Sequence, residues 1–173
     1  MERVALDVGS DFFVEMLTRA ARSPGEVVIV VSRPAGKIIL STKSFYPKGV
    51  YRLPTGKMKK PESPDEAALR ETYEETGHEI QSAGFLGTIL CYFTSQGETV
   101  TFPSHVLVTE EIEGSIAPID EHEGIIASLD TPPCCLRTVA TQLRDLPAPW
   151  ADWGKWRAVA HDFVYEALCK QEL

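Results

Sequence analysis

The chain has 173 residues, of which 43% are hydrophobic and 24% are charged, a composition typical of one globular domain and not of a disordered chain. It contains 17 Lys and Arg residues against 25 Asp and Glu residues, which gives a formal net charge of −8 at pH 7. This balance argues against binding to the backbone of a nucleic-acid polymer or to an anionic membrane surface. We therefore expect a single domain over residues 1–173.

The spacing of apolar residues predicts helices mixed with strands, and hence an α/β domain. A helix is expected near residues 10–22, and Gln96-Gly97 is typical of the turn in a β-hairpin. The C-terminal end, residues 135–171, has helical spacing, and its tryptophans at 150, 153 and 156 are expected to pack in the core. The expected strands lie at residues 26–32, 37–41, 85–94, 99–109 and 123–129.

The cysteines and the apolar runs indicate a cytoplasmic protein. Cys91, Cys134, Cys135 and Cys169 form no Cys-x-x-Cys pair and match no zinc spacing, as expected for thiols in a reducing compartment. No apolar leader follows a basic start. The longest aliphatic run, Val27–Val31, is far shorter than the roughly 20 residues of a membrane span. We therefore expect no membrane partner.

The net charge of −8 hides a separation of positive from negative residues along the chain. Residues 27–61 carry eight Lys and Arg residues and no Asp or Glu. Residues 62–130 carry fifteen Asp and Glu residues and a single cation, Arg70. Solvated surface faces would explain each run by itself. The boundary near residue 61 is nevertheless the first place to look for a site.

A helix is predicted directly after this boundary. Ser63 is the expected N-cap, Pro64 takes the first helical position, and Glu66 completes a capping box with Ser63. Gly77 is the expected end of the helix. The ends of the helix are thus predicted from sequence alone.

Three carboxylates, those of Glu71, Glu74 and Glu75, crowd one face of this helix within a single turn. Like charges at this spacing destabilise a helix slightly, and a solvated acidic face is the simplest alternative explanation. Mg²⁺, however, takes carboxylate oxygens together with phosphate oxygens of a substrate. Because a lysine-rich loop directly precedes the helix, the pattern favours a site for Mg²⁺ and phosphate.

A longer pattern of spaced residues contains this acidic face. Its members are Gly56, Glu62, Arg70, Glu71, Glu74, Glu75 and Gly77. In their order and spacing, residues 56–78 resemble the Nudix box. Thr72 and His78 stand where the box has aliphatic residues, and neither departure removes a carboxylate.

The resemblance implies a Nudix-like α/β/α sandwich around a mixed β-sheet, with the box forming a loop, a helix and a loop. It also implies a hydrolase that uses Mg²⁺ or Mn²⁺ to cleave a diphosphate linkage in a nucleoside diphosphate joined to another moiety. The partner would be such a small molecule and not a nucleic-acid polymer. Many relatives are dimers, so a homodimer is an open expectation.

Carried over position by position, the resemblance assigns roles to residues in and near the box. Glu71, Glu74 and Glu75 would be metal ligands, and a main-chain carbonyl at Thr55 or Gly56 would add one more. Glu62 and Arg70 would be structural, with Arg70 orienting the glutamates through charge-assisted hydrogen bonds.

Metal-assisted attack of water on phosphorus needs a general base within hydrogen-bond reach of that water. Glu71 and Glu75 are the first candidates for this catalytic role, and Glu98, Glu121 and Glu123 are the alternatives outside the box. By charge, the candidates for contact with the substrate phosphates are Arg52, Lys57, Lys59 and Lys60.

Two other functions are compatible with the same resemblance. A Nudix-type domain can bind nucleotides as a regulator without turnover, although such proteins usually lose glutamates of the box, and this chain keeps them. An isomerase of prenyl diphosphates would need a catalytic cysteine in a strand before the box, whereas the first cysteine here is Cys91. The identity of the substrate stays open.

Overall fold

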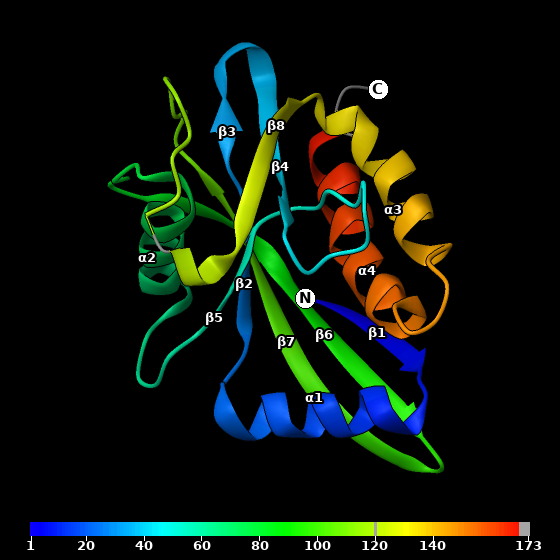
Figure 1. Cartoon of the computed structure of the whole chain (residues 1–173). Coiled ribbons are helices and arrows are strands. Elements are labelled where there is room, and N and C mark those ends of the chain that lie inside the picture. The colour runs from blue at the N-terminus through cyan, green and yellow to red at the C-terminus, as the bar shows by residue number, and fades with distance from the viewer. Residues whose placement is uncertain (120, 170–173) are drawn as a thin grey trace.

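Two β-sheets form the middle of the computed structural model, which describes residues 1–119 and 121–169 (Figure 1). Within these residues the larger sheet is mixed, with the strand order β1 (Glu2–Asp7), β6 (Ala83–Ser95), β7 (Glu98–Thr109), β2 (Glu26–Val30) and β5 (Thr55–Lys57). The β1–β6 and β2–β7 pairs are parallel, and the β6–β7 and β2–β5 pairs are antiparallel. The smaller sheet is antiparallel and has the order β3 (Ser32–Arg33), β4 (Lys37–Lys43) and β8 (Ile125–Thr131).

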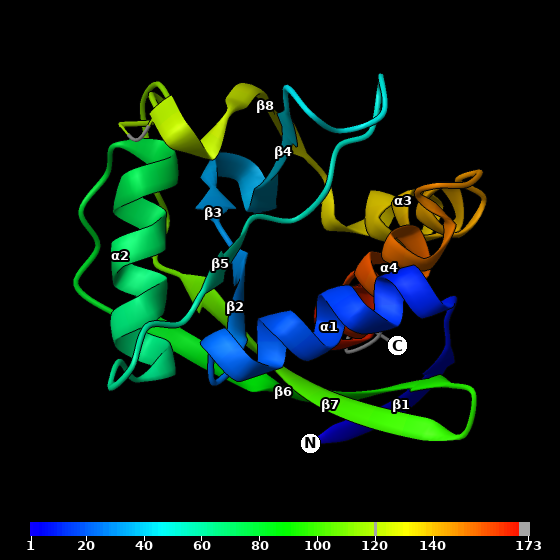
Figure 2. The same cartoon turned by 60° about the horizontal axis from the view of Figure 1, so that its bottom comes forward.

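Helices lie on both sides of these sheets (Figure 2). Helix α2 (Pro64–Thr76) covers one side. Helices α1 (Ser10–Arg22) and α4 (Ala151–Cys169) cover the other, and α3 (Leu136–Arg144) packs on α4. The predicted α/β/α sandwich around a mixed sheet is therefore confirmed.

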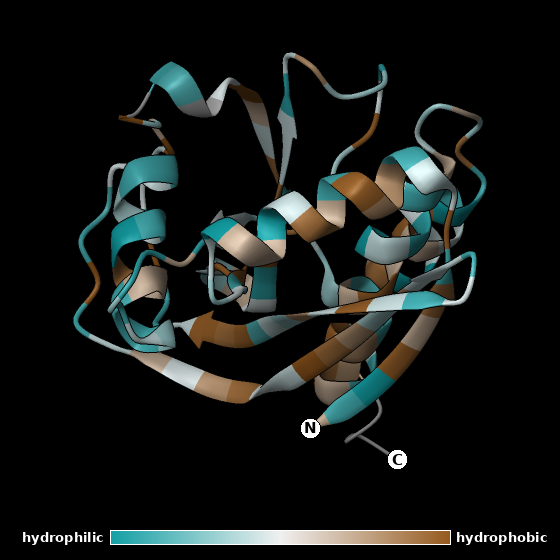
Figure 3. Ribbon diagram, turned by 90° about the horizontal axis from the view of Figure 1, so that it is seen from below, coloured by the Kyte–Doolittle hydropathy of each residue, from teal (hydrophilic) through white to brown (hydrophobic). Residues whose placement is uncertain are grey.

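Strand β2 shows why the sequence folds into three layers. Its side chains alternate between the faces of the sheet, and all five of its residues are buried. Val27 and Ile29 pack in the cluster that contains Ala68 of α2, whereas Val28 and Val30 pack in the cluster formed with α1 and α4. In Figure 3 the hydrophobic segments accordingly concentrate on the central strands, while much of α2 is hydrophilic.

The strand predicted over residues 26–32 is divided in the structure. Residues 26–30 form β2 in the large sheet, and Ser32 and Arg33 begin the small sheet as β3. The apolar run continues through Val31, past the end of β2, so its pattern does not reveal where the chain changes sheets. The short strand expected at 123–129 lies at Ile125–Thr131 and follows a 3₁₀ turn, η2 (Glu121–Glu123).

Two strands of the large sheet are absent from the sequence-based expectations. Strand β1 is short and mixes charged with apolar residues, and it forms because β6 supplies a parallel partner. Strand β5 lies at the start of the box, where a loop was expected, and it pairs with β2. Both depend on a partner distant in the sequence, which local patterns do not report.

The predicted hairpin and the predicted C-terminal helices are confirmed in the described residues. Gln96 and Gly97 have φ values of 51° and 86°, which suit the two central positions of a tight hairpin turn. The helical end expected over 135–171 forms α3 and α4, with residues 170 and 171 outside the described part. Trp156 is 2% exposed and packs in the core as predicted. No described helix is long and apolar enough to cross a membrane.

Candidate active site

Helix α2 begins and ends where the sequence predicts. The side chain of Ser63 accepts a hydrogen bond from the Glu66 amide at 3.3 Å, and Glu66 Oε2 accepts one from the Ser63 amide at 2.8 Å. Gly77 has a φ of 76°, and its N–H donates to the carbonyl of Tyr73 at 2.9 Å. These fixed ends determine which way each glutamate of the helix points.

Arg70 gathers the acidic residues at the edge of α2. Its Nε and Nη2 donate to the two carboxylate oxygens of Glu62 at 2.7 and 2.9 Å. Its Nη1 donates to Glu71 at 2.7 Å and to Glu74 at 2.9 Å, and Nη2 also reaches the carbonyl of Lys57 at 3.0 Å. The bonds with Glu62 raise the pKa of Arg70, and the bond from Arg70 lowers the pKa of Glu62.

Glu75 lies apart from these contacts and faces the small sheet. Its side chain is 2% exposed, and its Oε1 lies 3.3 Å from Nζ of Lys43 on β4, which is 9% exposed. Within residues 1–119 and 121–169, no three Asp, Glu, His or Cys side chains converge on one point suited to a metal ion. Like Glu71, which is also buried, Glu75 points inward because α2 packs against the strands.

Gly56 is required by the position of Glu71. A Cβ atom at residue 56 would lie 1.8 Å from Cδ of Glu71 and 2.2 Å from its Oε1. Because β5 runs this close to α2, only a glycine leaves room for the carboxylate. The close approach explains in physical terms why the box begins with this residue.

Gly56→Ala is therefore expected to displace the Glu71 carboxylate while leaving the chain folded, since the clash is with the end of a flexible side chain. A displacement of this size typically lowers turnover about 10²-fold. The measurement is kcat on a diphosphate substrate together with Tm. Gly9→Ala is the matched control because its Cβ would lie 3.4 Å from the nearest atom, Oδ2 of Asp152. Equal turnover in the two variants would contradict the prediction.

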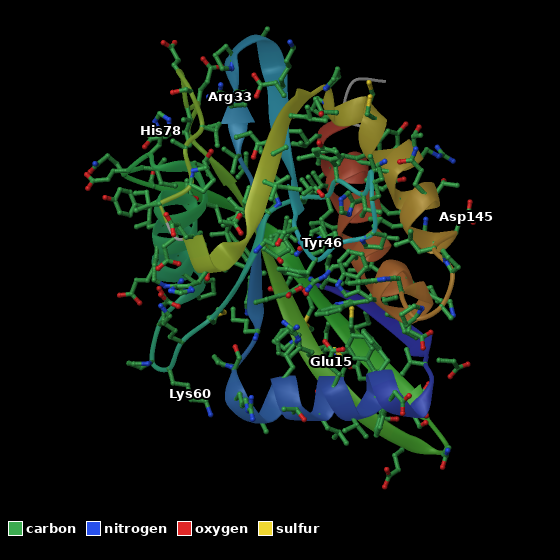
Figure 4. The ribbon with its side chains drawn as sticks, in the orientation of Figure 1. Glu15, Arg33, Tyr46, Lys60, His78 and Asp145 are labelled. Atoms are coloured by element: carbon green, nitrogen blue, oxygen red, sulfur yellow. The ribbon has the colours of Figure 1, made fainter. Side chains whose placement is uncertain are left out.

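A cleft of about 680 Å³ opens between α1, the box and α4. In Figure 4, Lys60 lies on the loop before α2 and Tyr46 lies between the sheets and α4, and both line this cleft. Thr55, Gly56, Glu71 and Glu74 line it as well. The structure therefore brings two carboxylates of the box, Glu71 and Glu74, to the same cavity as its cations.

The predicted phosphate contacts differ from one another in their surroundings. Lys57, Lys59 and Lys60 are exposed at the cleft. Arg52, by contrast, is 5% exposed, and its Nη1 donates to the Leu53 carbonyl at 2.8 Å and to Thr55 Oγ1 at 2.9 Å. Burial lowers the pKa of Arg52. Arg52 is thus a fixed part of the cleft wall, whereas the lysines lie at its opening.

Two of the three alternative bases, Glu98 and Glu121, do not line the cleft. Glu98 lies at the turn of the β6–β7 hairpin, paired with Ser95, and is exposed. Glu121 is exposed in η2. The side chain of Glu123 lies outside the described residues, as does Asp120. Among the candidate bases whose side chains the structure describes, Glu71 alone lines this cleft, with Glu75 one turn further along α2.

His161 ties the start of the box to α4. Its Nε2 accepts a hydrogen bond from the Leu53 amide at 3.0 Å, so its Nδ1 carries the proton and donates to the Arg157 carbonyl at 2.8 Å. The side chain is 1% exposed, and burial lowers its pKa from 6.5 to about 3. The neutral imidazole therefore fixes the segment that carries Arg52 and Thr55.

Acid is expected to weaken the fold through His161. Below pH 6.5 this histidine is protonated in the unfolded chain. In the folded chain it stays neutral down to about pH 3. Between about pH 7.5 and about pH 5, wild type should lose about 2 kcal/mol more unfolding free energy than His161→Gln, whose side chain does not titrate. Urea unfolding at both pH values measures this difference. Parallel losses in the two proteins would show that His161 does not carry the effect.

Several residues that line the cleft are not predicted from the sequence. Arg19 and Arg22 come from the last turn of α1, and Trp153 and Arg157 come from α4. Basic residues at a helix C-terminus are common, because they complement the helix dipole, so they give no functional signal by themselves. Lys43 is one of the eight cations of residues 27–61, and the sequence signal that sets it apart is its place at the end of a buried strand, where lysine is rare.

The sequence of this chain matches a family model and is similar to those of two known proteins. A family model described as NUDIX domain matches residues 22–137. The ADP-ribose pyrophosphatase of Bacillus subtilis (strain 168) is 34% identical over 93 residues, which are 53% of this chain and 48% of that protein. The methanol dehydrogenase activator of Bacillus methanolicus is 35% identical over 78 residues, which are 44% of this chain and 40% of that protein. The matches thus span about half the length of these curated relatives or less.

Solved structures share the fold at low sequence identity. A MutT protein from Methanosarcina mazei Go1 has a TM-score of 0.55 and 15% identity, covering 100% of this chain and 99% of that one. A MutT NUDIX hydrolase from Burkholderia pseudomallei has a TM-score of 0.54 and 22% identity, covering 82% and 98%. The E. coli dihydroneopterin triphosphate pyrophosphohydrolase has a TM-score of 0.58 and 13% identity, covering 86% and 97%.

Proposed function

Because the chain belongs to the NUDIX domain family, we propose that it hydrolyses a diphosphate linkage in a nucleoside diphosphate joined to another moiety. One observation carries the proposal: Glu71 and Glu74 line the same cleft as Arg52, Lys57 and the following lysines. Carboxylates and cations at one cavity suit a divalent metal and a phosphate chain, respectively. The similarity to an ADP-ribose pyrophosphatase supports the same class of reaction.

The residues present fit Mg²⁺ or Mn²⁺ in their donor chemistry. Glu71 and Glu74 offer carboxylate oxygens, and Thr55 and Gly56, which line the same cleft, are the residues whose main-chain carbonyl would add a ligand. Glu75 would complete the set on the inner side of α2, where Lys43 now contacts it. When bound, the metal would neutralise phosphate oxygens and lower the pKa of the attacking water.

We assign the remaining roles to residues of the chain as follows. Arg70 orients Glu71 and Glu74, and Glu62 holds Arg70 in place through two hydrogen bonds. Glu71 or Glu75 accepts a proton from the attacking water. The water oxygen then bonds to one phosphorus, the bond from that phosphorus to the bridging oxygen breaks, and the bridging oxygen leaves with the other phosphate. The lysines of the box bind the negative charge of both products.

The test is a panel of diphosphate compounds with products separated by anion-exchange chromatography. The panel includes ADP-ribose, NADH, nucleoside triphosphates and dinucleoside polyphosphates, each assayed with Mg²⁺, with Mn²⁺ and with EDTA. We expect hydrolysis of at least one compound with metal and only background with EDTA. No turnover of any compound, combined with retained nucleotide binding, would instead support a non-catalytic regulatory domain. A cytoplasmic location and a homodimer remain predictions.

A further inference from the structure

Three arginines from separate parts of the chain line the inner part of the cleft, and we call them the arginine cluster: Arg19, Arg52 and Arg157. Arg19 lies on α1, Arg52 precedes β5, and Arg157 lies on α4. Residues 22–137 match the family model, so Arg19 and Arg157 come from elements outside the matched region.

The cluster holds more positive charge than the carboxylates around it neutralise. Nη1 of Arg157 donates to both oxygens of Glu26, at 2.8 and 3.0 Å. Arg19 lies 3.5 Å from Glu15, whose side chain is 52% exposed. Arg52 makes no ion pair within the described residues, and its partners are a carbonyl and two hydroxyls. Three guanidinium groups thus contact one buried carboxylate and one exposed carboxylate.

Packing holds the three cations close together in spite of their repulsion. Arg157 and Arg19 lie over the ring of Trp156, at 3.7 and 5.3 Å from its centroid. Arg52 lies over Tyr46 at 5.0 Å and over Trp153 at 5.8 Å. Arg157 in turn lowers the pKa of both Arg19 and Arg52, after the larger effect of burial. The aromatic rings supply part of the stabilisation that carboxylates do not.

The cluster also has an excess of hydrogen-bond donors. In the part of the chain that the structure describes, Nε of each of the three arginines is buried without an acceptor. Arg52 and Arg157 are themselves only 5% and 6% exposed. Buried donors without acceptors are rare in proteins because they destabilise the fold. Because the protein itself encloses these Nε atoms, it is the unneutralised charge of the cluster at the cleft that calls for an anion with several oxygens.

We propose that the arginine cluster binds a phosphate group of the substrate other than the diphosphate that is cleaved at the box. This inference rests on the proposed function and narrows its substrate class. The preferred substrate carries at least one phosphate beyond the cleaved diphosphate, as in a nucleoside triphosphate. A diphosphate joined to an uncharged sugar leaves the cluster unneutralised and is the poorer substrate. Arginine suits this task because its planar fork binds two phosphate oxygens at once.

Anion binding is tested without metal, so that it does not depend on hydrolysis. In EDTA, inorganic tripolyphosphate should raise the Tm of wild type by about 5 °C at about 100 times its Kd. Arg19→Gln should lose most of this shift, whereas Arg3→Gln, which removes an exposed arginine of β1 outside the cleft, should keep it. Should Arg19→Gln fail to fold, Arg19→Lys keeps the charge and the stem, and we expect about tenfold weaker binding. No shift in wild type, or equal shifts in the variants, would overturn the site.

Kinetics test the substrate class separately. With Mg²⁺, the kcat/KM of wild type for a nucleoside triphosphate should exceed that for ADP-ribose by about tenfold or more, and Arg19→Gln should reduce this ratio by about tenfold. A preference of wild type for ADP-ribose would overturn the inference and leave the proposed hydrolase intact. Absence of all hydrolysis would reject the proposed function, and the metal-free measurement would still decide whether the cluster binds phosphate.

Discussion

Glu71→Gln is expected to lower kcat by about 10²- to 10⁴-fold, the range found when a group that moves a proton in the reaction is removed. Glu71 lines the cleft, is 4% exposed and accepts a hydrogen bond from Arg70 at 2.7 Å. Glutamine keeps the shape of the side chain but removes the negative charge that both proton transfer and metal binding require. The fold should survive because Arg70 keeps its contacts with Glu62 and Glu74.

The measurement is kcat on the best substrate of the panel, with Tm to show that the variant is folded. Glu79→Gln is the matched control, because it removes the same charge from an exposed residue just beyond α2. We expect Glu79→Gln to keep wild-type turnover. A folded Glu71→Gln protein whose kcat lies within about threefold of wild type would remove Glu71 from the catalytic assignment.

The effect of Glu75→Gln on stability distinguishes the role of Glu75 from that of Glu71, the other candidate base. Glu75 lies 3.3 Å from Lys43, and both side chains are buried, so the glutamine variant removes the negative charge beside a buried ammonium. Its turnover loss would therefore come with a lower Tm, unlike that of Glu71→Gln. Comparison of the two variants shows whether catalysis or the buried ion pair explains any common loss of activity.

Glu26→Gln is expected to lower the free energy of unfolding by about 3–5 kcal/mol, the usual effect of removing one partner of a buried ion pair. Glu26 is 2% exposed. Among the residues that the structure describes, it is the only buried carboxylate in contact with the arginine cluster. Without it, the ion pair that the cluster keeps in the described residues is that of Arg19 with the exposed carboxylate of Glu15. Glutamine retains an acceptor for the hydroxyl of Ser104, which now donates to Glu26 Oε1 at 2.8 Å.

Urea unfolding at neutral pH measures this loss. Glu15→Gln is the control, and we expect less than about 1 kcal/mol because its ion pair with Arg19 lies at the surface. Added phosphate should recover part of the stability of Glu26→Gln if the cluster binds anions, since a bound anion replaces the missing negative charge. A stability loss below about 1 kcal/mol in Glu26→Gln would show that the cluster tolerates its charge without a carboxylate.

Features that depend on neighbouring residues were predictable from the sequence. The capping box of Ser63 and Glu66, and the end of α2 at Gly77, follow from contacts three or four residues apart. The hairpin at Gln96-Gly97 follows from a local backbone preference. The pattern from Gly56 to Gly77 therefore identified the family and the acidic helix before any tertiary contact was known.

Features that depend on distant segments were decided only by the tertiary structure. The inward orientation of Glu75 arises because β4 brings Lys43 against α2, and the need for glycine at residue 56 arises because β5 approaches Glu71. The arginine cluster exists only because α1 and α4 pack on the same face of the sheet. The sequence by itself determined the chemistry of the box, since that chemistry lies within one helix and its loop. The remaining walls of the cleft come from residues that no local pattern connects.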